Sequence, residues 1–305
     1  MTHLDFNLVA ALRALLEERN VTRAAARLGL SQPAMSAALA RLRRHYGDPL
    51  LTRAGNAYEL TPLAAILRER SAAACDMLDR VFSAQASFDP AEPRDFTLAC
   101  SDYGAAVFGA ALARVLHEHA PQIRLHLRHL SPALVENAAT VLSTIDGMVL
   151  PHGVIDGLPA VELYQDRWVC LIADDHPDVP GGPTLDDLNR LPWVVYQRAY
   201  DAPVARQLSM MGTSPRVEVY APTFQLLPLL VEKTRRVALI QERLARLSVG
   251  GARVRVEPCP FPAVPVQMAL WWHPHHKHDP AHIWLRERAT EVGQALREAP
   301  EPSTR

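Results

Sequence analysis

Side chains of the kinds that read the edges of DNA bases lie close together near the N-terminus. Gln32 can form paired hydrogen bonds with adenine, and the hydroxyl of Ser36 can bond to several bases. Pro33 and Met35 add apolar groups that can contact a thymine methyl group. This set of side chains predicts recognition of bases in the major groove of double-stranded DNA.

Basic residues surround this segment, although the whole chain is nearly neutral. The 305 residues include 32 Lys and Arg against 33 Asp and Glu, so a nucleic-acid footprint has to be local. Contacts to phosphates supply affinity without sequence information, and Arg53 is expected to enter the minor groove. The residues expected near phosphates are Arg23, Arg41, Arg43 and Arg44.

Helix-capping residues predict the elements that hold these side chains. Thr22 is expected to cap a short helix that ends at Gly29, where a tight turn needs a left-handed conformation. Ser31 is expected to cap the next helix, with Pro33 in its first turn and Met35 on its inward face. Two short helices joined by a Gly-containing turn indicate a helix-turn-helix, although an ordinary helical cluster with a solvated basic face is the alternative.

A hairpin and a long helix are predicted to follow. Residues 50–53 and 58–60 flank a Gly-containing turn, as the two strands of a wing would. Residues 63–84 have the spacing of one amphipathic helix. Its apolar stripe is too long for a small wing domain to cover, and we expect it to pair with a second chain. The stripe comprises Leu63, Leu67, Leu78 and Phe82.

Composition argues against several other classes of protein. The four cysteines are never at C-x-x-C spacing, which disfavours a disulfide framework and a zinc site. No basic leader and no uncharged apolar run of membrane-spanning length is present, so we expect a cytoplasmic protein with no membrane partner. The G-x-S-x-G, Walker, G-x-G-x-x-G and H-E-x-x-H motifs are missing, and neither an enzyme nor a cofactor is expected.

The remaining two thirds of the chain have the pattern of an α/β protein. A linker with two prolines covers residues 85–94, and apolar runs with β propensity then alternate with helical patterns. Such alternation predicts α/β units on a mostly parallel sheet. The expected strands are residues 96–100, 123–127, 145–150, 168–173, 193–196, 217–220, 237–240 and 266–272.

A histidine cluster near the C-terminus raises the question of a metal site. The spacing of the histidines matches no standard zinc pattern, and Pro274 breaks any helical face that would align the rings. We therefore predict no metal ligand here, but an exposed loop after the last strand, with Asp279 capping the helix that Pro280 opens. The cluster comprises His273, His275, His276 and His278.

The wording of the N-terminal motif resembles one protein family. Residues 21–44 read VTRAAARLGLSQPAMSAALARLRR and residues 47–53 read GDPLLTR. This segment resembles the N-terminal domain of LysR-type transcriptional regulators, closely over about the first 85 residues and in length and element order beyond. The chain is most similar to the nodulation-regulator branch, which shares SQPAMSAA and the HDPAHIWLR segment at residues 278–286. One departure is Ala37, where many members carry Arg.

The resemblance implies a multidomain α/β architecture. A winged helix-turn-helix would precede a periplasmic-binding-protein-like effector domain of two α/β subdomains, and members assemble as homodimers or homotetramers on promoter DNA. The expected segments are the winged helix-turn-helix at residues 1–62, a dimerisation helix at 63–84, a hinge linker at 85–94 and the effector domain at 95–305. Subdomain I would comprise about 95–163 and 269–305, and subdomain II about 164–268.

The resemblance also implies that a small organic effector, aromatic or acidic, lies between the subdomains. This agrees with the rule that open α/β sheets bind ligands beyond the carboxyl ends of their strands. Ser101, Asp102 and Ser131 lie where strands are expected to lead into helices, with simple helix capping as the alternative for the two serines. The other candidates are His152, Tyr196 and Phe224. A C-terminal domain that only oligomerises, or an enzyme or solute-binding protein with an accessory helical domain, are the alternative functions.

Overall fold

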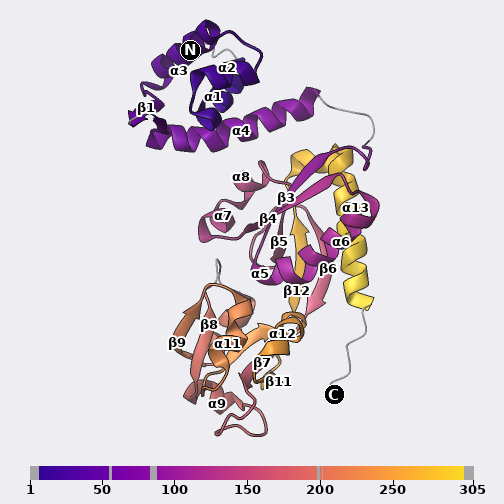
Figure 1. Ribbon diagram of the computed structural model, residues 1–305. Helices are drawn as coiled ribbons and strands as arrows, with labels where there is room; N and C mark the ends of the chain where they lie inside the picture. Colours follow the sequence, from indigo (N-terminus) through magenta and orange to yellow (C-terminus); the bar gives the residue numbers. More distant parts are fainter. Residues whose placement is uncertain (1–6, 55–56, 83–87, 198–199, 201, 299–305) are drawn as a thin grey trace. The chain divides into compact units, whose positions relative to one another are not determined.

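The computed structural model describes residues 7–54, 57–82, 88–197, 200 and 202–298. The chain forms two compact units, Met1–Gln85 and Ala86–Arg305 (Figure 1). The first unit contains α1 (Asn7–Glu18), α2 (Val21–Arg27), α3 (Gln32–Tyr46), the hairpin of β1 (Leu51–Ala54) and β2 (Ala57–Leu60), and α4 (Pro62–Phe82).

The turn between α2 and α3 follows the capping rules with one difference. The Ser31 hydroxyl accepts a hydrogen bond from the Ala34 amide at 3.3 Å, and Gly29 has a φ of 65°, so both predictions are confirmed. The predicted cap at Thr22 is wrong, because Asn20 caps α2 by accepting from the Arg23 amide at 3.0 Å. Asn20 has the extended backbone of a cap residue, which leaves Thr22 inside the first turn.

The core of the first unit determines which side of α3 faces outward. Met35, Leu39 and Leu42 are buried at positions i, i+4 and i+7, which share one face of a helix. Met35 is fully buried, so the predicted contact between Met35 and a thymine methyl group is wrong. A side chain that fills the core cannot also reach a base edge.

The first half of α4 also belongs to this core. Leu67 is buried, and Leu63 packs against the same cluster, to which α1 contributes. The prediction that the wing domain leaves the stripe uncovered is therefore wrong for these two residues. Leu78 is partly exposed, and the side chain of Phe82 lies outside the described residues.

The second unit contains the strands that the sequence predicts and two more. The strands are β3 (Arg94–Cys100), β4 (Ile123–His129), β5 (Gly147–Pro151), β6 (Ala160–Asp166), β7 (Trp168–Ala173), β8 (Pro192–Tyr196), β9 (Arg216–Ala221), β10 (Ala238–Gln241), β11 (Val254–Pro258) and β12 (Val266–Trp271). Strands β6 and β11 are the additions. The helices include α5 (Asp102–Gly104), α6 (Ala110–His119), α7 (Pro132–Glu136), α8 (Ala138–Leu142), α9 (Leu185–Arg190), α10 (Pro203–Met210), α11 (Leu227–Val231), α12 (Glu242–Ser248) and α13 (Pro280–Glu298). A short π-helical segment lies at Ala105–Gly109, and short 3-10 helices lie at Phe224–Leu226, Val249–Gly251 and Pro274–His278.

These strands form mixed sheets, which corrects the expectation of a mostly parallel one. In the order β4-β3-β5-β12-β6, strand β3 runs parallel to β4 and β5, whereas β12 runs antiparallel to β5 and β6. Strand β7 lies antiparallel between β10 and β11, and β8 pairs parallel with β9. The chain leaves the five-stranded sheet along β6 and returns along β12, so β12 must run against its neighbours.

One residue, Arg167, separates the end of β6 from the start of β7, where the chain passes from the five-stranded sheet to the second group of strands.

The final helix, α13, packs against β6. This packing is tight, because a Cβ atom at Gly293 would lie 2.5 Å from the carbonyl oxygen of Leu163. Glycine at this position therefore allows the helix to approach the strand.

We expect Gly293→Ala to lower the free energy of unfolding by about 1–3 kcal/mol, because the added methyl group meets backbone atoms that cannot turn aside. Gly250→Ala is the matched control, since a Cβ atom there meets nothing within 4 Å. Urea unfolding of the two variants measures the difference. Equal free energies of unfolding would contradict the close packing of α13 on β6.

Candidate DNA-binding surface and ligand cavity

The outward face of α3 begins with polar side chains. Gln32 and Ser36 are exposed in the first two turns, together with Pro33. The cap at Ser31 fixes where this helix starts, and the buried residues Met35 and Leu39 fix its rotation. The two predicted base-reading side chains therefore share a solvent-facing surface.

Basic side chains near this face have different surroundings. Arg23 is exposed, but its guanidinium pairs with Glu18, with Nε 3.2 Å from Oε2. Arg41 and Arg53 are exposed, and Arg53 lies on the wing strand β1, opposite Tyr58. Thr22 is also exposed, in the first turn of α2.

Arg43 has a structural role that the sequence did not reveal. Its Nε donates to the carbonyl of Pro49 at 2.8 Å, and its Nη2 donates to the carbonyl of Leu51 at 3.3 Å. These bonds connect the C-terminal part of α3 to the start of the wing. The guanidinium is thus held by backbone carbonyls while the side chain stays exposed, and its role near phosphates remains a prediction.

A cavity of about 170 Å³ lies inside the second unit. It brings together residues from the five-stranded sheet, from β7 and β10, and from the segments after β8 and β9. Three predicted effector contacts, His152, Tyr196 and Phe224, line it. Its other lining residues are Tyr103, Pro151, Trp168, Tyr200, Ala202, Pro203, Gln241, Val264, Pro265, Val266, Gln267 and Met268.

Aromatic rings form much of the wall. The Phe224 ring lies 4.1 Å from the Tyr196 ring, 6.3 Å from Trp168 and 6.5 Å from Tyr103, measured between centroids. None of the described residues that line the cavity is Arg, Lys, Asp or Glu. His152 is paired through Nε2 with Glu162 at 2.6 Å. The wall therefore suits a flat, uncharged ring.

Gln241 supplies a polar group that the sequence reasoning missed. Its side chain is 3% exposed, and its Oε1 atom is buried without a hydrogen-bond partner among the described residues. A buried acceptor left unpaired costs about 1–3 kcal/mol, so a donor supplied by a ligand is favoured. Gln241 ends β10 opposite Trp168 of β7, a pairing that arises only from the tertiary register.

Three predicted effector residues do not line the cavity. The Ser101 hydroxyl accepts from the Gly104 amide at 3.2 Å, and the Ser131 hydroxyl accepts from the Leu134 amide at 3.4 Å, so both cap helices. Asp102 accepts from the Gln225 amide at 3.0 Å, which links the helix after β3 to the segment after β9. Burial raises the pKa of Asp102 above its usual value.

A buried hydrogen-bond cluster lies beside the cavity, at the crossover between β6 and β7. The Tyr103 hydroxyl donates to Asp166 Oδ2 at 2.8 Å, and the Arg167 amide donates to Oδ1 at 2.8 Å. The Arg243 amide approaches Oδ2 at 3.4 Å. Burial raises the pKa of Asp166 to about 6, against the lowering effect of these donors. Tyr103 therefore contacts both the cavity and the crossover.

One member of the C-terminal histidine cluster is packed in the core, and others are exposed. The ring of His276 is buried and stacks on His282 with centroids 4.2 Å apart, so the expectation of an exposed loop is wrong for His276. The predicted cap is confirmed, because Asp279 Oδ1 accepts from the Ala281 amide at 2.9 Å. Among the described residues, no cluster of three or more His, Cys, Asp or Glu side chains has a geometry that could hold a metal ion.

Comparisons with known proteins agree with both units. Residues 6–65 match the bacterial regulatory helix-turn-helix of the LysR family, and residues 91–294 match the LysR substrate binding domain. Nodulation protein D of Bradyrhizobium sp. (strain ANU 289) is 31% identical over 311 residues, which cover 99% of this chain and 91% of that protein. No helix among the described residues is long and apolar enough to cross a membrane.

Solved structures show the same arrangement of elements. A probable transcriptional regulator from Pseudomonas aeruginosa, PA0477, is 29% identical with a TM-score of 0.71, and the match covers 94% of this chain and 97% of that one. CbnR in complex with its target DNA has the same fold at 15% identity and a TM-score of 0.66, over 95% of this chain and 100% of that one. This chain belongs to the LysR family of bacterial DNA-binding transcriptional regulators.

Proposed function

We propose that this regulator works in the cytoplasm without enzymatic activity, reads its operator through Gln32 and Ser36, and responds to a small phenolic ligand in the aromatic cavity. The observation that carries the ligand proposal is the aromatic, uncharged wall of the cavity, which also includes Gln241, whose Oε1 has no hydrogen-bond partner among the described residues. A hydroxyl on the ligand would donate to this oxygen while the ring contacts Phe224 and Tyr196.

The cavity volume supports a ligand with one ring. A cavity of about 150 Å³ lined by apolar side chains accommodates benzene, and this cavity is of similar size. The uncharged lining favours a phenol over a carboxylate, because a buried carboxylate needs a cationic partner. Of the two ligand classes considered from the sequence, the aromatic one therefore fits better than the organic acid.

Tyr103 provides a route from the cavity to the crossover. Its ring lines the cavity, and its hydroxyl bonds to Asp166, next to the residue that joins the two groups of strands. A ligand that moves the Tyr103 ring therefore also acts on this bond. We propose that ligand binding changes the angle between the subdomains and hence the geometry of the paired DNA-binding units.

For DNA binding, we expect Gln32→Ala and Ser36→Ala each to weaken specific binding by about 1–3 kcal/mol and to relax base preference. Arg41→Ala should weaken binding to all sequences alike and lower the slope of log K against log salt by about one. Titrations with operator and scrambled DNA at several salt concentrations separate the two effects. If Gln32→Ala weakened both DNAs equally, α3 would not read bases through this residue.

For assembly, we propose that the C-terminal half of α4 pairs with a second chain through Leu78, which is partly exposed. Leu78→Asp should lower the sedimenting mass with little effect on unfolding. Leu67→Asp should instead lower the free energy of unfolding by more than about 2 kcal/mol, because Leu67 is part of the core and the new carboxylate would be buried there. Analytical ultracentrifugation and urea unfolding distinguish the variants. An unchanged mass for Leu78→Asp would contradict the pairing of α4 with a second chain.

For the ligand, we expect phenol to raise the unfolding temperature of the protein more than toluene does. Gln241→Leu should weaken phenol binding about 2- to 10-fold, the value of one neutral hydrogen bond, and leave toluene binding unchanged. Ser101→Ala is the control, because its hydroxyl caps a helix outside the cavity. Equal loss for phenol and toluene, or a larger loss in Ser101→Ala, would contradict the assignment of Gln241.

For pH dependence, the raised pKa of Asp166 means that the folded protein favours the protonated acid. This contribution to stability is fully present below the unfolded pKa of about 4 and is lost as the pH rises through about 6. The free energy of unfolding of the wild type, relative to Asp166→Asn, should therefore rise by about 2 kcal/mol between pH 7 and pH 4. Urea unfolding across this range measures it. A difference that does not change with pH would contradict the burial of an ionisable Asp166.

A further inference from the structure

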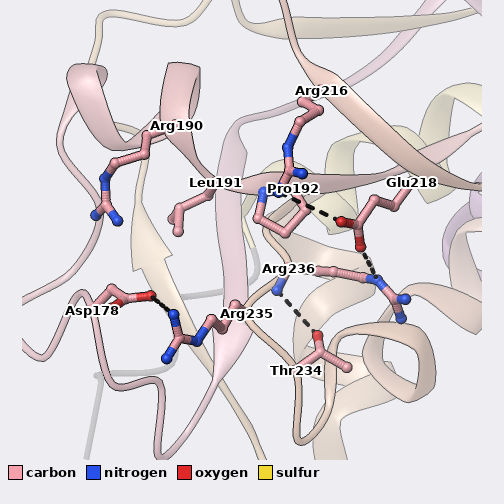
Figure 2. A pocket seen from close by; sticks show the side chains of 9 residues that line it. All are labelled: Asp178, Arg190, Leu191, Pro192, Arg216, Glu218, Thr234, Arg235 and Arg236. Atoms are coloured by element: carbon pink, nitrogen blue, oxygen red, sulfur yellow. Dashed lines mark hydrogen bonds and ion pairs between the residues drawn. The ribbon is translucent and has the colours of Figure 1, made fainter.

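A second hollow, of about 290 Å³, lies at the opposite end of β8 and β9 from the aromatic cavity. The aromatic cavity takes Tyr196 from the end of β8, whereas this hollow takes Pro192 and Arg216 from the starts of β8 and β9, which pair in register. Five residues of strand span roughly 13–17 Å, so the two sites are separate. Other walls come from the end of α9 and from the turn before β10 (Figure 2).

Arginines dominate the lining of this hollow. Figure 2 shows Arg190 beside Leu191, Arg216 above Pro192, and Arg235 and Arg236 below them. The carboxylates in the lining are Asp178 and Glu218. Four arginines and two carboxylates therefore line the hollow. Asp187, outside the lining, pairs with Arg190 at 2.7 Å, and one positive charge still remains in excess.

The existing ion pairs leave donor groups open to solvent. Glu218 is shared between two arginines, at 3.1 Å from Arg236 Nε and 3.5 Å from Arg216 Nη2. Asp178 lies 3.5 Å from Arg235 Nη1. The side chains of Arg216 and Arg235 are 63% and 67% exposed, so most of each guanidinium fork is accessible.

Arg236 is the fixed member of the group. It is less exposed than the others, and its Nη1 donates to the carbonyl of Leu230 at 3.2 Å, while its amide donates to the Thr234 hydroxyl at 3.1 Å. One guanidinium held by backbone and carboxylate contacts therefore lies in the same lining as more exposed ones, which can turn toward an anion. Guanidinium forks match the geometry of carboxylate and phosphate, and they bind both through paired hydrogen bonds.

We propose that this hollow is a second ligand site, which binds a small multivalent oxyanion such as a phosphate ester or a dicarboxylate. Its anion would replace part of the charge of Glu218 and Asp178 and bind the exposed guanidinium groups of Arg216 and Arg235. The site depends on none of the residues of the aromatic cavity, so it stands or fails independently of the phenolic ligand.

Isothermal titration of the full-length protein with inorganic phosphate and with succinate, at constant ionic strength in chloride, tests the proposal. We expect saturable binding of at least one anion, weakened about tenfold or more in the double variant Arg216→Gln, Arg235→Gln. Arg253→Gln is the matched control, because Arg253 is equally exposed and pairs with one carboxylate, Asp174, outside the hollow. Stronger binding of phosphate would indicate a phosphate ester, and stronger binding of succinate a dicarboxylate.

Glu218→Gln provides an independent test that does not rely on a loss. Removing the carboxylate shared by Arg216 and Arg236 should tighten anion binding several-fold, because the competing internal anion is gone. The proposal would be overturned if neither anion showed saturable binding with a Kd below about 10 mM, that is, if each bound with a free energy weaker than about 3 kcal/mol. Equal affinity in the wild type, the double variant and Glu218→Gln would also overturn it.

Discussion

The buried carboxylate of Asp166 determines how the ligand-binding unit is arranged. Its hydrogen-bond donors come from α5 beside the five-stranded sheet, from the crossover itself and from the start of α12. A carboxyl group in such a place is tolerated only when its oxygens are paired, so these three elements must stay together. The aromatic cavity lies beside this cluster, and its shape depends on the same contacts.

In the cavity, the ring of Tyr103 and the amide of Gln241 offer a ligand different kinds of contact. Because the hydroxyl of Tyr103 is already bonded to Asp166, Tyr103 offers only its ring to a ligand. Gln241 is one polar group of the wall that could select for a ligand hydroxyl, beside the hydroxyls of Tyr196 and Tyr200 and the amide of Gln267. A site that expects a hydrogen bond discriminates strongly against analogues that lack the donor, whereas apolar contacts discriminate weakly. In the proposed site, specificity would therefore come from polar groups such as the amide of Gln241 at the end of β10.

Sequence reasoning succeeded where structure is local and missed what tertiary packing creates. The Ser31 cap and the left-handed Gly29 depend on neighbouring residues and were predictable. From the sequence, Met35 could either contact a base or fill the core. The packing of α1 against α3 places it in the core. Gln241 and Arg216 have no local signal, because each becomes functional only beside partners from distant strands. The domain limits and the roles of the DNA-facing residues remain predictions.

The link that Arg43 makes between α3 and the wing has a consequence for the DNA itself. Since two backbone carbonyls hold the guanidinium, the helix and the wing form a rigid body with a fixed spacing. If the helix and the wing keep this spacing on DNA, a duplex with a groove of another width would have to bend or narrow to fit them. The energy of that deformation depends on the stiffness of base-pair steps that the protein never touches. Flexible steps between contacted bases would then raise affinity without any hydrogen bond of their own.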